Sequence, residues 1–257
     1  MSPQRRGPRP VLREIEILAL VREYLATTPW TGEGHRKVYA WIRHVKGLKL
    51  GKDRVWRVMR DNRLLSPRRQ PQGEANLHDG KITTAMPDLI WGTDGFKVRT
   101  LKDGWVWGFL AIDHCHGEIM GLYASKRGDA FAALQPIAMG LSRVRGGVEH
   151  GIGKGISVRE DHGAQYMSAT YRKQAEAWGM NLTYAFVGEP ETNGVAERMV
   201  RTLKEQIIYG RVIENLNDLR QRLEIFMRTY NSMWRLEKNR YLTPNEARQQ
   251  HAKNKAA

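Results

Sequence analysis

The chain has 257 residues, with 42 Lys and Arg against 27 Asp and Glu, which gives a formal net charge of +15. That length accommodates a small domain beside a larger one, and the positive charge favours a polyanionic partner over a basic surface that serves only solubility. The single cysteine, Cys115, excludes an intramolecular disulfide and a two-Cys, two-His zinc module, and no apolar stretch is long enough to span a membrane.

The positive charge is concentrated near the N-terminus. Residues 1–72 carry 17 basic and 6 acidic side chains, which leaves the rest of the chain closer to neutral. The first ten residues combine Arg and Pro without an apolar core, so they indicate a flexible basic arm and not a secretory signal.

Helical periodicity predicts three short helices over residues 13–28, 34–45 and 54–62, with Asp53 as the N-cap of the third. Three short helices with a basic last one are typical of a helix-turn-helix-like DNA-binding segment. We expect Lys52, Arg54 and Arg57 to contact DNA. The alternative is a small helical bundle whose arginines are only solvated.

Residues 66–87, rich in Pro, Arg, Gln, Gly and Asn, are predicted to be a linker. Three strands joined by short turns follow, over 89–98, 104–112 and 118–124, and they predict an antiparallel meander. The middle strand is apolar on both faces, so we expect it to lie inside the sheet.

Helices and strands then alternate. We predict helices over 129–144, 167–178, 194–209 and 216–230 and strands over 155–160 and 181–187. Thr243 to Glu246 has the pattern of a capping box, with Pro at the first helical position. Three strands followed by this alternation are the element order of the RNase H-like fold, so the predicted fold class is a mixed α/β sheet.

Three carboxylates lie in recognisable local contexts. Asp94 ends Leu-Ile-Trp-Gly-Thr-Asp, Asp161 follows Gly-Ile-Ser-Val-Arg-Glu, and Glu197 follows Thr-Asn-Gly-Val-Ala. Asp161 and Glu197 have 35 residues between them. From about Trp30 onward the chain resembles the OrfB class of insertion-sequence transposases, whose catalytic core is similar to that of retroviral integrases.

The resemblance implies that Asp94, Asp161 and Glu197 converge at one edge of the sheet as catalytic, metal-binding residues. Carboxylates held close together repel each other unless cations offset their charge, and two divalent ions would do so. An all-carboxylate site favours Mg²⁺ or Mn²⁺ over zinc. For either aspartate taken alone, a role in a turn or as an N-cap remains the alternative.

The helix that carries Glu197 also places Arg201 and Lys204 on its face, at i+4 and i+7, where we expect contacts with DNA. The family places a lysine at the same spacing, and Asn193 and Gln165 match further motif positions as weaker DNA-binding or site-shaping candidates. A merely solvated helix face is the alternative. Asp113 is expected to be structural, and Glu160 to point to the opposite side of the sheet from Asp161.

The resemblance implies an enzyme that cleaves the ends of a mobile DNA element and transfers the 3′-hydroxyl to target DNA. Its partners would be terminal inverted repeats, target DNA, further copies of itself and an upstream OrfA-type protein or fusion partner, in the bacterial cytoplasm at the nucleoid. Two alternatives are a non-catalytic DNA-binding regulator and an RNase H-like nuclease. The expected organisation is a DNA-binding segment over 1–65, a linker over 66–84, a core over 85–215 and a helical extension over 216–257.

Overall fold

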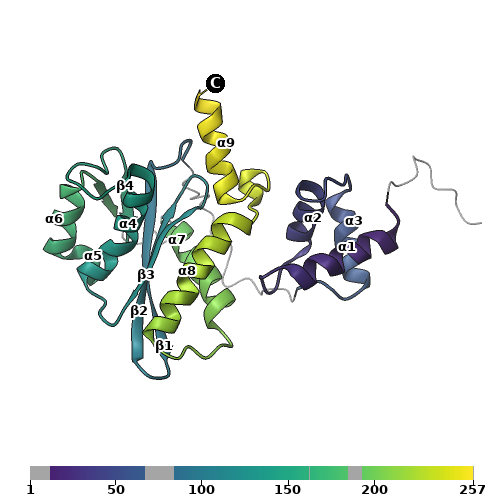
Figure 1. Ribbon diagram of the computed structural model, residues 1–257, viewed down its shortest axis with the longest axis horizontal. Coiled ribbons are helices and arrows are strands. Elements are labelled where there is room, and N and C mark those ends of the chain that lie inside the picture. Colours follow the sequence, from purple (N-terminus) through teal and green to yellow (C-terminus); the bar gives the residue numbers. More distant parts are fainter. Residues whose placement is uncertain (1–11, 67–83, 162, 185–192, 257) are drawn as a thin grey trace, which may run out of the picture. The chain divides into compact units, whose positions relative to one another are not determined.

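The computed structural model describes residues 12–66, 84–161, 163–184 and 193–256. The chain divides into two compact units, Met1–Ala75 and Asn76–Ala257 (Figure 1). Most of the predicted linker lies outside the described residues.

The N-terminal unit contains the three predicted helices, α1 (Glu14–Thr27), α2 (His35–His44) and α3 (Lys52–Asp61). They bury a common apolar cluster, which consists of Ile17, Val21, Val38, Ile42, Val55, Val58 and Met59. Each helix therefore contributes one apolar face to a small core of its own, and its polar face stays in solvent.

The start of α3 differs from the prediction. Gly51 occupies the N-cap position without a side-chain cap, and Asp53 lies inside the first turn. The prediction of Asp53 as N-cap is therefore wrong, although its negative charge still suits the positive end of the helix. The helix begins two residues earlier because Gly51 ends the extended segment before it.

The second unit is built on a five-stranded mixed sheet with the order β3-β2-β1-β4-β5. Its strands are β1 (Ile90–Thr100), β2 (Gly104–Asp113), β3 (Ile119–Ser125), β4 (Ser157–Glu160) and β5 (Asn181–Tyr184). The first three pair antiparallel, and β4 and β5 run parallel to β1. The predicted meander and RNase H-like element order are confirmed, and β1 lies at the centre of the sheet.

Helices cover both faces of this sheet (Figure 1). One face carries α4 (Ala130–Arg145), α5 (Ala164–Met167) and α6 (Ala169–Ala177), and the other carries α7 (Gly194–Leu203) and α8 (Leu216–Met233). The helix predicted over 167–178 is instead interrupted at Ser168, whose side chain accepts a hydrogen bond from the Tyr171 backbone and caps α6.

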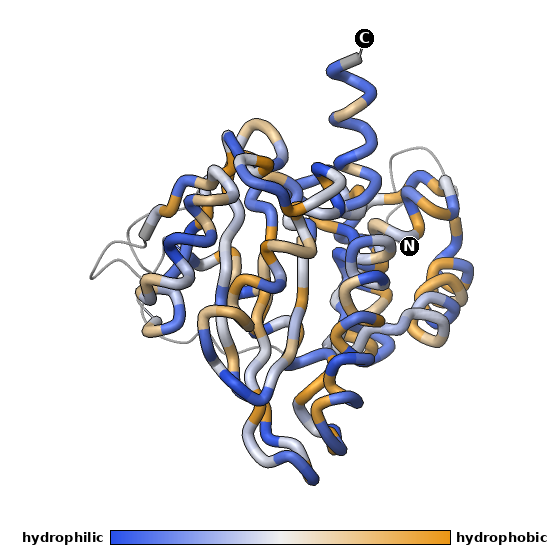
Figure 2. Tube along the Cα trace, turned by 60° about the vertical axis from the view of Figure 1, so that its left-hand side comes forward, coloured by the Kyte–Doolittle hydropathy of each residue, from blue (hydrophilic) through white to orange (hydrophobic). Residues whose placement is uncertain are grey.

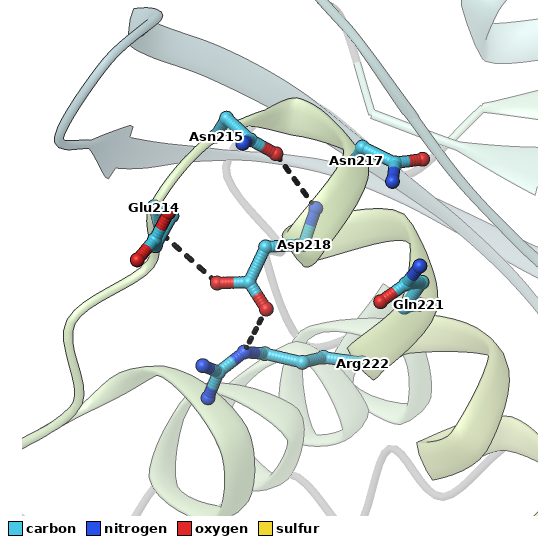
Figure 3. A pocket seen from close by; sticks show the side chains of 6 residues that line it. All are labelled: Glu214, Asn215, Asn217, Asp218, Gln221 and Arg222. Atoms are coloured by element: carbon cyan, nitrogen blue, oxygen red, sulfur yellow. Dashed lines mark hydrogen bonds and ion pairs between the residues drawn. The ribbon is translucent and has the colours of Figure 1, made fainter.

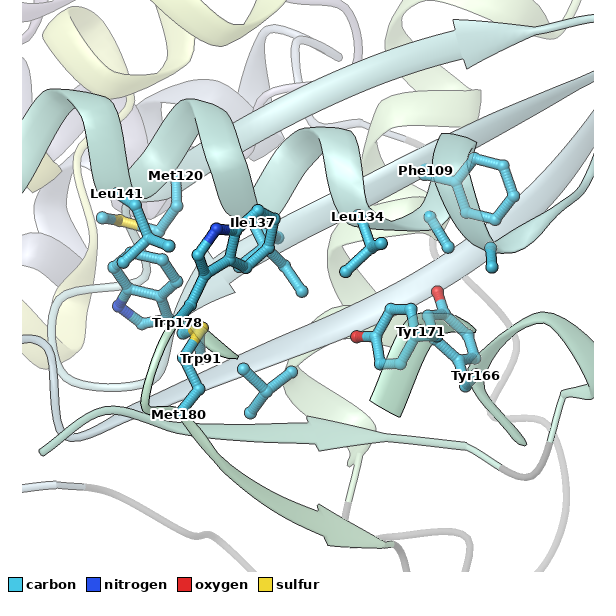
Figure 4. Packing of buried hydrophobic residues seen from close by; sticks show 14 of the residues in the cluster. Trp91, Phe109, Met120, Leu134, Ile137, Leu141, Tyr166, Tyr171, Trp178 and Met180 are labelled. Carbon is cyan, nitrogen blue, oxygen red and sulfur yellow. The ribbon is translucent and has the colours of Figure 1, made fainter. Parts of the chain in front are cut away.

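The main core lies between the sheet and the α4 side. It includes Trp91, Phe109, Met120, Leu134, Ile137, Leu141, Tyr166, Tyr171, Trp178 and Met180, drawn in Figure 4. Five of the ten are aromatic, and aromatic side chains bury large apolar areas, so the core fixes this layer firmly against the sheet.

The C-terminal helices are tied to the turn between β2 and β3. The Asn231 side chain bonds both the backbone N–H and the carbonyl of Ile119, each at 2.9 Å. Arg248 on α9 (Pro244–Ala256) forms an ion pair with Asp88 at 2.7 Å and another with Glu118. Residues 216–256 therefore pack in the same compact unit as the sheet.

Helix α9 begins with the predicted capping box. The Thr243 hydroxyl accepts from the Glu246 backbone at 3.2 Å, and a Glu246 carboxylate oxygen accepts from the Thr243 backbone at 2.9 Å. Most of the helix beyond this turn is hydrophilic (Figure 2). Among the described helices, none has the length and apolar composition that a membrane crossing requires.

The β1–β2 turn holds the segment that leads into α8. Leu101 and Lys102 donate backbone hydrogen bonds to Ile213 and Glu214, both at 2.8 Å. Asn215 caps α8 by accepting from the Asp218 backbone, and Asp218 in turn pairs with Arg222 at 2.7 Å (Figure 3). The polar side chains that line the shallow pocket at this point therefore bond to one another and fix the start of α8.

Candidate active site: carboxylates beside strand β1

Asp94 and Asp161 lie on the same face of the sheet. Side chains alternate along a strand, so Gly92 and Asp94 on β1 share a face. Arg159 on β4 pairs directly with Gly92, which places Asp161, two residues further, on that face as well. This is the face that α7 covers, and α7 carries Glu197.

Gly92 lets α7 come close to β1. A Cβ atom at this position would lie 2.8 Å from Nε2 of His114, 3.3 Å from Oδ1 of Asn193 and 3.4 Å from the Cβ of Ala196. A side chain here would collide with the His114 ring and crowd the start of α7. Because Glu197 directly follows Ala196, this close approach brings its carboxylate towards Asp94.

Asn193 ties the start of α7 to the strand. Its side-chain amide donates to the Thr93 carbonyl at 2.9 Å, and the residue is only 2% exposed. The bond joins the residue next to Asp94 to the residue four positions before Glu197. Such burial does not suit the predicted contact between Asn193 and DNA, and it indicates a residue that positions the two carboxylates.

Asp161 is held by the turn that follows it. Its Oδ1 accepts a hydrogen bond from the Gly163 backbone at 2.9 Å. A Cβ at Gly163 would lie 2.6 Å from Nε2 of Gln165, and one at Gly95 would lie 3.5 Å from the same atom. The Gln165 side chain thus lies close to both Gly95 on β1 and Gly163, and its site-shaping role stays a prediction.

The three carboxylates influence one another electrostatically. Burial raises the pKa of Asp94 to about 7, and the negative charges of Asp161 and Glu197 add to the increase. Burial also raises the pKa of Glu197, and Asp161 again adds to it, while Arg201 opposes it. Neighbouring carboxylates therefore contribute to the raised pKa values of Asp94 and Glu197, and repulsion of this kind is what a bound cation would offset.

The chemistry of these donors fits a hard divalent ion, because all are carboxylate oxygens on one face of the sheet. Within the described residues, no three His, Cys, Asp or Glu side chains are gathered at metal-ligand spacing. The three carboxylates are thus near enough to repel each other, but they are not arranged around one shared ion position. Asp94, Asp161 and Glu197 would be the metal ligands.

Lys204 approaches the same group from the end of α7. The helix changes there into a π-helical turn, Lys204–Ile208, and π-helical turns often occur at functional sites. The Lys204 ammonium lies 5.7 Å from the centre of the Phe96 ring, and its charge lowers the pKa of Asp94. Arg201, one turn earlier, is exposed.

Two further carboxylates are separated from this group, as expected. Glu160 is fully buried on the opposite side of the sheet, and burial raises its pKa to about 8, although a hydrogen bond with Tyr171 lowers it and the charge of Asp161 adds to the increase. Asp113 accepts backbone hydrogen bonds from Asp88 and His116, both at 3.0 Å, and so stabilises the start of the sheet and the β2–β3 turn.

In the N-terminal unit, the three residues predicted to contact DNA have different surroundings. Arg57 is exposed and Lys52 is half-buried, whereas Arg54 donates a hydrogen bond to the Leu12 carbonyl. Sequence reasoning missed Trp56, which is 37% exposed and has the Arg60 guanidinium 4.8 Å from its ring. In the sequence, Trp56 could have been noticed as an aromatic residue on the polar face of α3, away from Val55 and Val58.

Comparison with known proteins supports the resemblance to mobile-element enzymes. Residues 178–244 match the family described as Integrase core domain, a segment that includes Glu197 and Lys204 but neither aspartate. The Escherichia coli transposase InsD for insertion element IS2A/D/F/H/I/K is 26% identical over 200 residues, which cover 76% of this chain and 65% of that protein. The transposase InsD for insertion element IS2-9 of Escherichia coli strain K12 is also 26% identical, with 64% of its length covered.

This chain therefore spans about 65% of the length of the curated relatives that it matches. Two solved structures are also similar. The simian T-cell lymphotropic virus intasome in complex with the PP2A regulatory subunit B56 gamma gives 15% identity, a TM-score of 0.47 and coverage of 84% of this chain and 70% of that chain. The HTLV-2 integrase catalytic core domain in complex with magnesium gives 14% identity, a TM-score of 0.43 and coverage of 64% and 98%. The predicted resemblance to insertion-sequence transposases with an integrase-like core is confirmed.

The raised pKa of Asp94 predicts that Asp94→Asn stabilises the metal-free protein as pH rises. A carboxyl whose pKa is higher in the folded state loses stability as pH rises from the unfolded value, 3.8, through about 7. In chelator, the advantage of the Asn variant in unfolding free energy should therefore grow by about 2 kcal/mol between pH 5 and pH 8. Urea unfolding at both pH values measures it.

The exposed Asp53→Asn serves as the matched control and should show no such growth. If Asp94→Asn changed the unfolding free energy by the same amount at both pH values, the raised pKa of Asp94 and its stated causes, burial and repulsion, would be contradicted.

Asn193→Ala should lower the unfolding free energy by about 1–3 kcal/mol, because it leaves the buried Thr93 carbonyl without its donor. Denaturant unfolding tests this, with the exposed Asn217→Ala on α8 as the control. If the two variants were equally stable, the Asn193 hydrogen bond between α7 and β1 would contribute nothing to the unfolding free energy.

Proposed function

We propose that this chain, which is similar to insertion-sequence transposases, is a DDE transposase that cleaves the ends of a mobile DNA element and joins the 3′-hydroxyl to target DNA. The observation that carries the proposal is the electrostatic coupling of Asp94, Asp161 and Glu197 on one face of the sheet. Three carboxylates that repel one another cost stability, and a metal-dependent reaction gives a reason to retain them.

The carboxylates would hold two Mg²⁺ or Mn²⁺ ions, which stabilise the attacking and leaving oxygens of an in-line phosphoryl transfer. The protein's own part is to position these ligands. Asn193 and Gly92 keep α7 against β1, and Gly163 orients one oxygen of Asp161. Burial of Asp94 favours its protonated form, so cation binding should release a proton near neutral pH.

Lys204 and Arg201 are the proposed contacts for the phosphates of the DNA end. Lys204 lies near enough to Asp94 to lower its pKa, and Arg201 does the same for Glu197, so both cations border the carboxylates. A phosphate backbone that reaches the carboxylates would pass these side chains, and their charge would offset its own.

The N-terminal unit is proposed to bind the terminal inverted repeats. Arg57, Trp56 and Arg60 share the exposed side of α3, and this basic helix is the last of three, as in a helix-turn-helix. Because Arg54 already donates to Leu12, its proposed part in binding is to hold α3 in place. Self-assembly on DNA, an upstream OrfA-type partner and a cytoplasmic location remain predictions.

The two alternatives fit the arrangement less well. A non-catalytic regulator would have no use for three mutually repelling carboxylates. A nuclease for RNA–DNA hybrids would need neither the basic helical unit nor the cations beside Glu197. A strand-transfer assay separates them, since only the transposase joins a 3′-hydroxyl to a second DNA.

Asp161→Asn should abolish both cleavage and joining while leaving the fold intact, because the amide keeps the shape of the side chain and removes its charge. The assay incubates the protein with Mg²⁺, a labelled inverted-repeat end and a target plasmid, and then resolves joined products on a gel. Gln135→Ala, at an exposed position on α4, is the control. Turnover of Asp161→Asn at the wild-type rate would refute the catalytic assignment.

Arg57→Ala should weaken binding to inverted-repeat duplex and reduce the slope of log K against log salt by about 0.9, the value for one neutralised phosphate. Fluorescence anisotropy across a salt series measures the slope. The equally exposed Arg22→Ala on α1 should leave it unchanged. If both variants keep the wild-type slope, α3 is not the helix that meets DNA.

A further inference from the structure

The outer half of the β1–β2 hairpin leaves one face of the sheet open. Exposure alternates along β1, where Phe96 and Val98 are buried and Lys97 and Arg99 are exposed. On β2 the same alternation exposes Trp105, at 63% of its surface. The buried side faces the segment before α8, because the hairpin turn bonds residues 213 and 214. On the opposite side Trp107 packs against the core and Gly128, whereas Trp105, nearer the turn, stays exposed.

The open face combines aromatic rings with cations in register. Lys97 pairs directly across the strands with Trp107, and Arg99 with Trp105. The Lys97 ammonium lies 4.7 Å from the centre of the Trp107 ring, close enough for a cation–π interaction. Trp107 is half-buried and stacks on Phe109, so the inner pair is fixed, whereas Trp105 remains uncovered.

The positive charges of this face are not neutralised within the described part of the chain. Neither Lys97 nor Arg99 forms an ion pair with a described carboxylate. The acidic groups near the turn are used elsewhere, since Asp103 pairs with Lys126 at 2.9 Å and Glu214 with Lys102 at 2.9 Å. The face is therefore basic as well as aromatic.

We propose that this face, defined by Lys97, Arg99, Trp105 and Trp107, binds single-stranded DNA, with the exposed ring of Trp105 stacking on a base and Arg99 contacting the adjacent phosphate. Aromatic rings beside cations are the means by which proteins bind unpaired strands without reading their sequence. A duplex offers no free base for the ring, because its bases are stacked on each other. The choice of DNA as partner rests on the proposed function, and the choice of a single strand rests on Trp105.

Binding of the full chain to labelled oligothymidine, followed by fluorescence anisotropy, tests the proposal. Trp105→Ala should weaken binding about fivefold or more, and Trp105→Phe should retain most of it because the ring remains. Arg99→Ala should reduce the slope of log K against log salt by about 0.7, the value for one phosphate of a single strand. Affinity for blunt duplex DNA should stay unchanged in Trp105→Ala.

Ile225→Ala on α8 is the matched control, since that side chain is 57% exposed and apolar but has no such cross-strand basic partner. It should bind oligothymidine as the wild type does. Wild-type affinity in Trp105→Ala would overturn the proposal. So would weaker self-association of Trp105→Ala in sedimentation with unchanged affinity for oligothymidine, which would assign the face to a second copy of the chain.

The strand-transfer assay keeps this test separate from the proposed function. If the wild type joins no DNA but Trp105→Ala still loses oligothymidine affinity, the strand-transfer function fails and the single-strand site stands. If joining proceeds and Trp105→Ala binds oligothymidine normally, only the single-strand site fails.

Discussion

The close approach of α7 to β1 is the constraint on which the candidate site depends. Gly92 provides the space, and Asn193 closes it with a buried hydrogen bond to the Thr93 carbonyl. A buried carbonyl that lost this donor would destabilise the fold, so the contact has both a structural and a positional effect. The close packing at Gly92 and the Asn193 bond together hold the start of α7, and with it Glu197, beside the strand that carries Asp94.

The same packing makes the site electrostatically unfavourable. Burial and two neighbouring negative charges raise the pKa of Asp94 to about 7, although the Gly95 backbone and Lys204 oppose the increase, and Arg201 opposes that of Glu197. The free energy of unfolding is a small difference between large opposing terms. The destabilisation caused by this repulsion is therefore tolerated where other parts of the fold contribute enough stability. The aromatic core under α4, on the other side of the sheet, and the ion pairs of Arg248 on α9 contribute that stability.

The two ends of the sheet serve different purposes. At the β2–β3 turn, side chains from the C-terminal segment bond the backbone directly, as Asn231 on α8 does at Ile119 and Lys238, between α8 and α9, does at His114. At the β1–β2 turn, the segment before α8 covers one face of the hairpin and leaves the other open. The first arrangement makes the C-terminal helices part of the core, and the second leaves Trp105 available for a partner.

The sequence alone determined the order of helices and strands, the mixed sheet and the three candidate carboxylates, because periodicity, turn residues and short motifs are local properties of the chain. It also predicted the capping box at Thr243, whose contacts span three residues. Only the tertiary structure decided the roles of Asn193, which bonds a residue 100 positions away, and Arg54, which bonds one 42 positions away. Local patterns carry no record of such distant partners, since burial and charge at a residue depend on which segments pack against it.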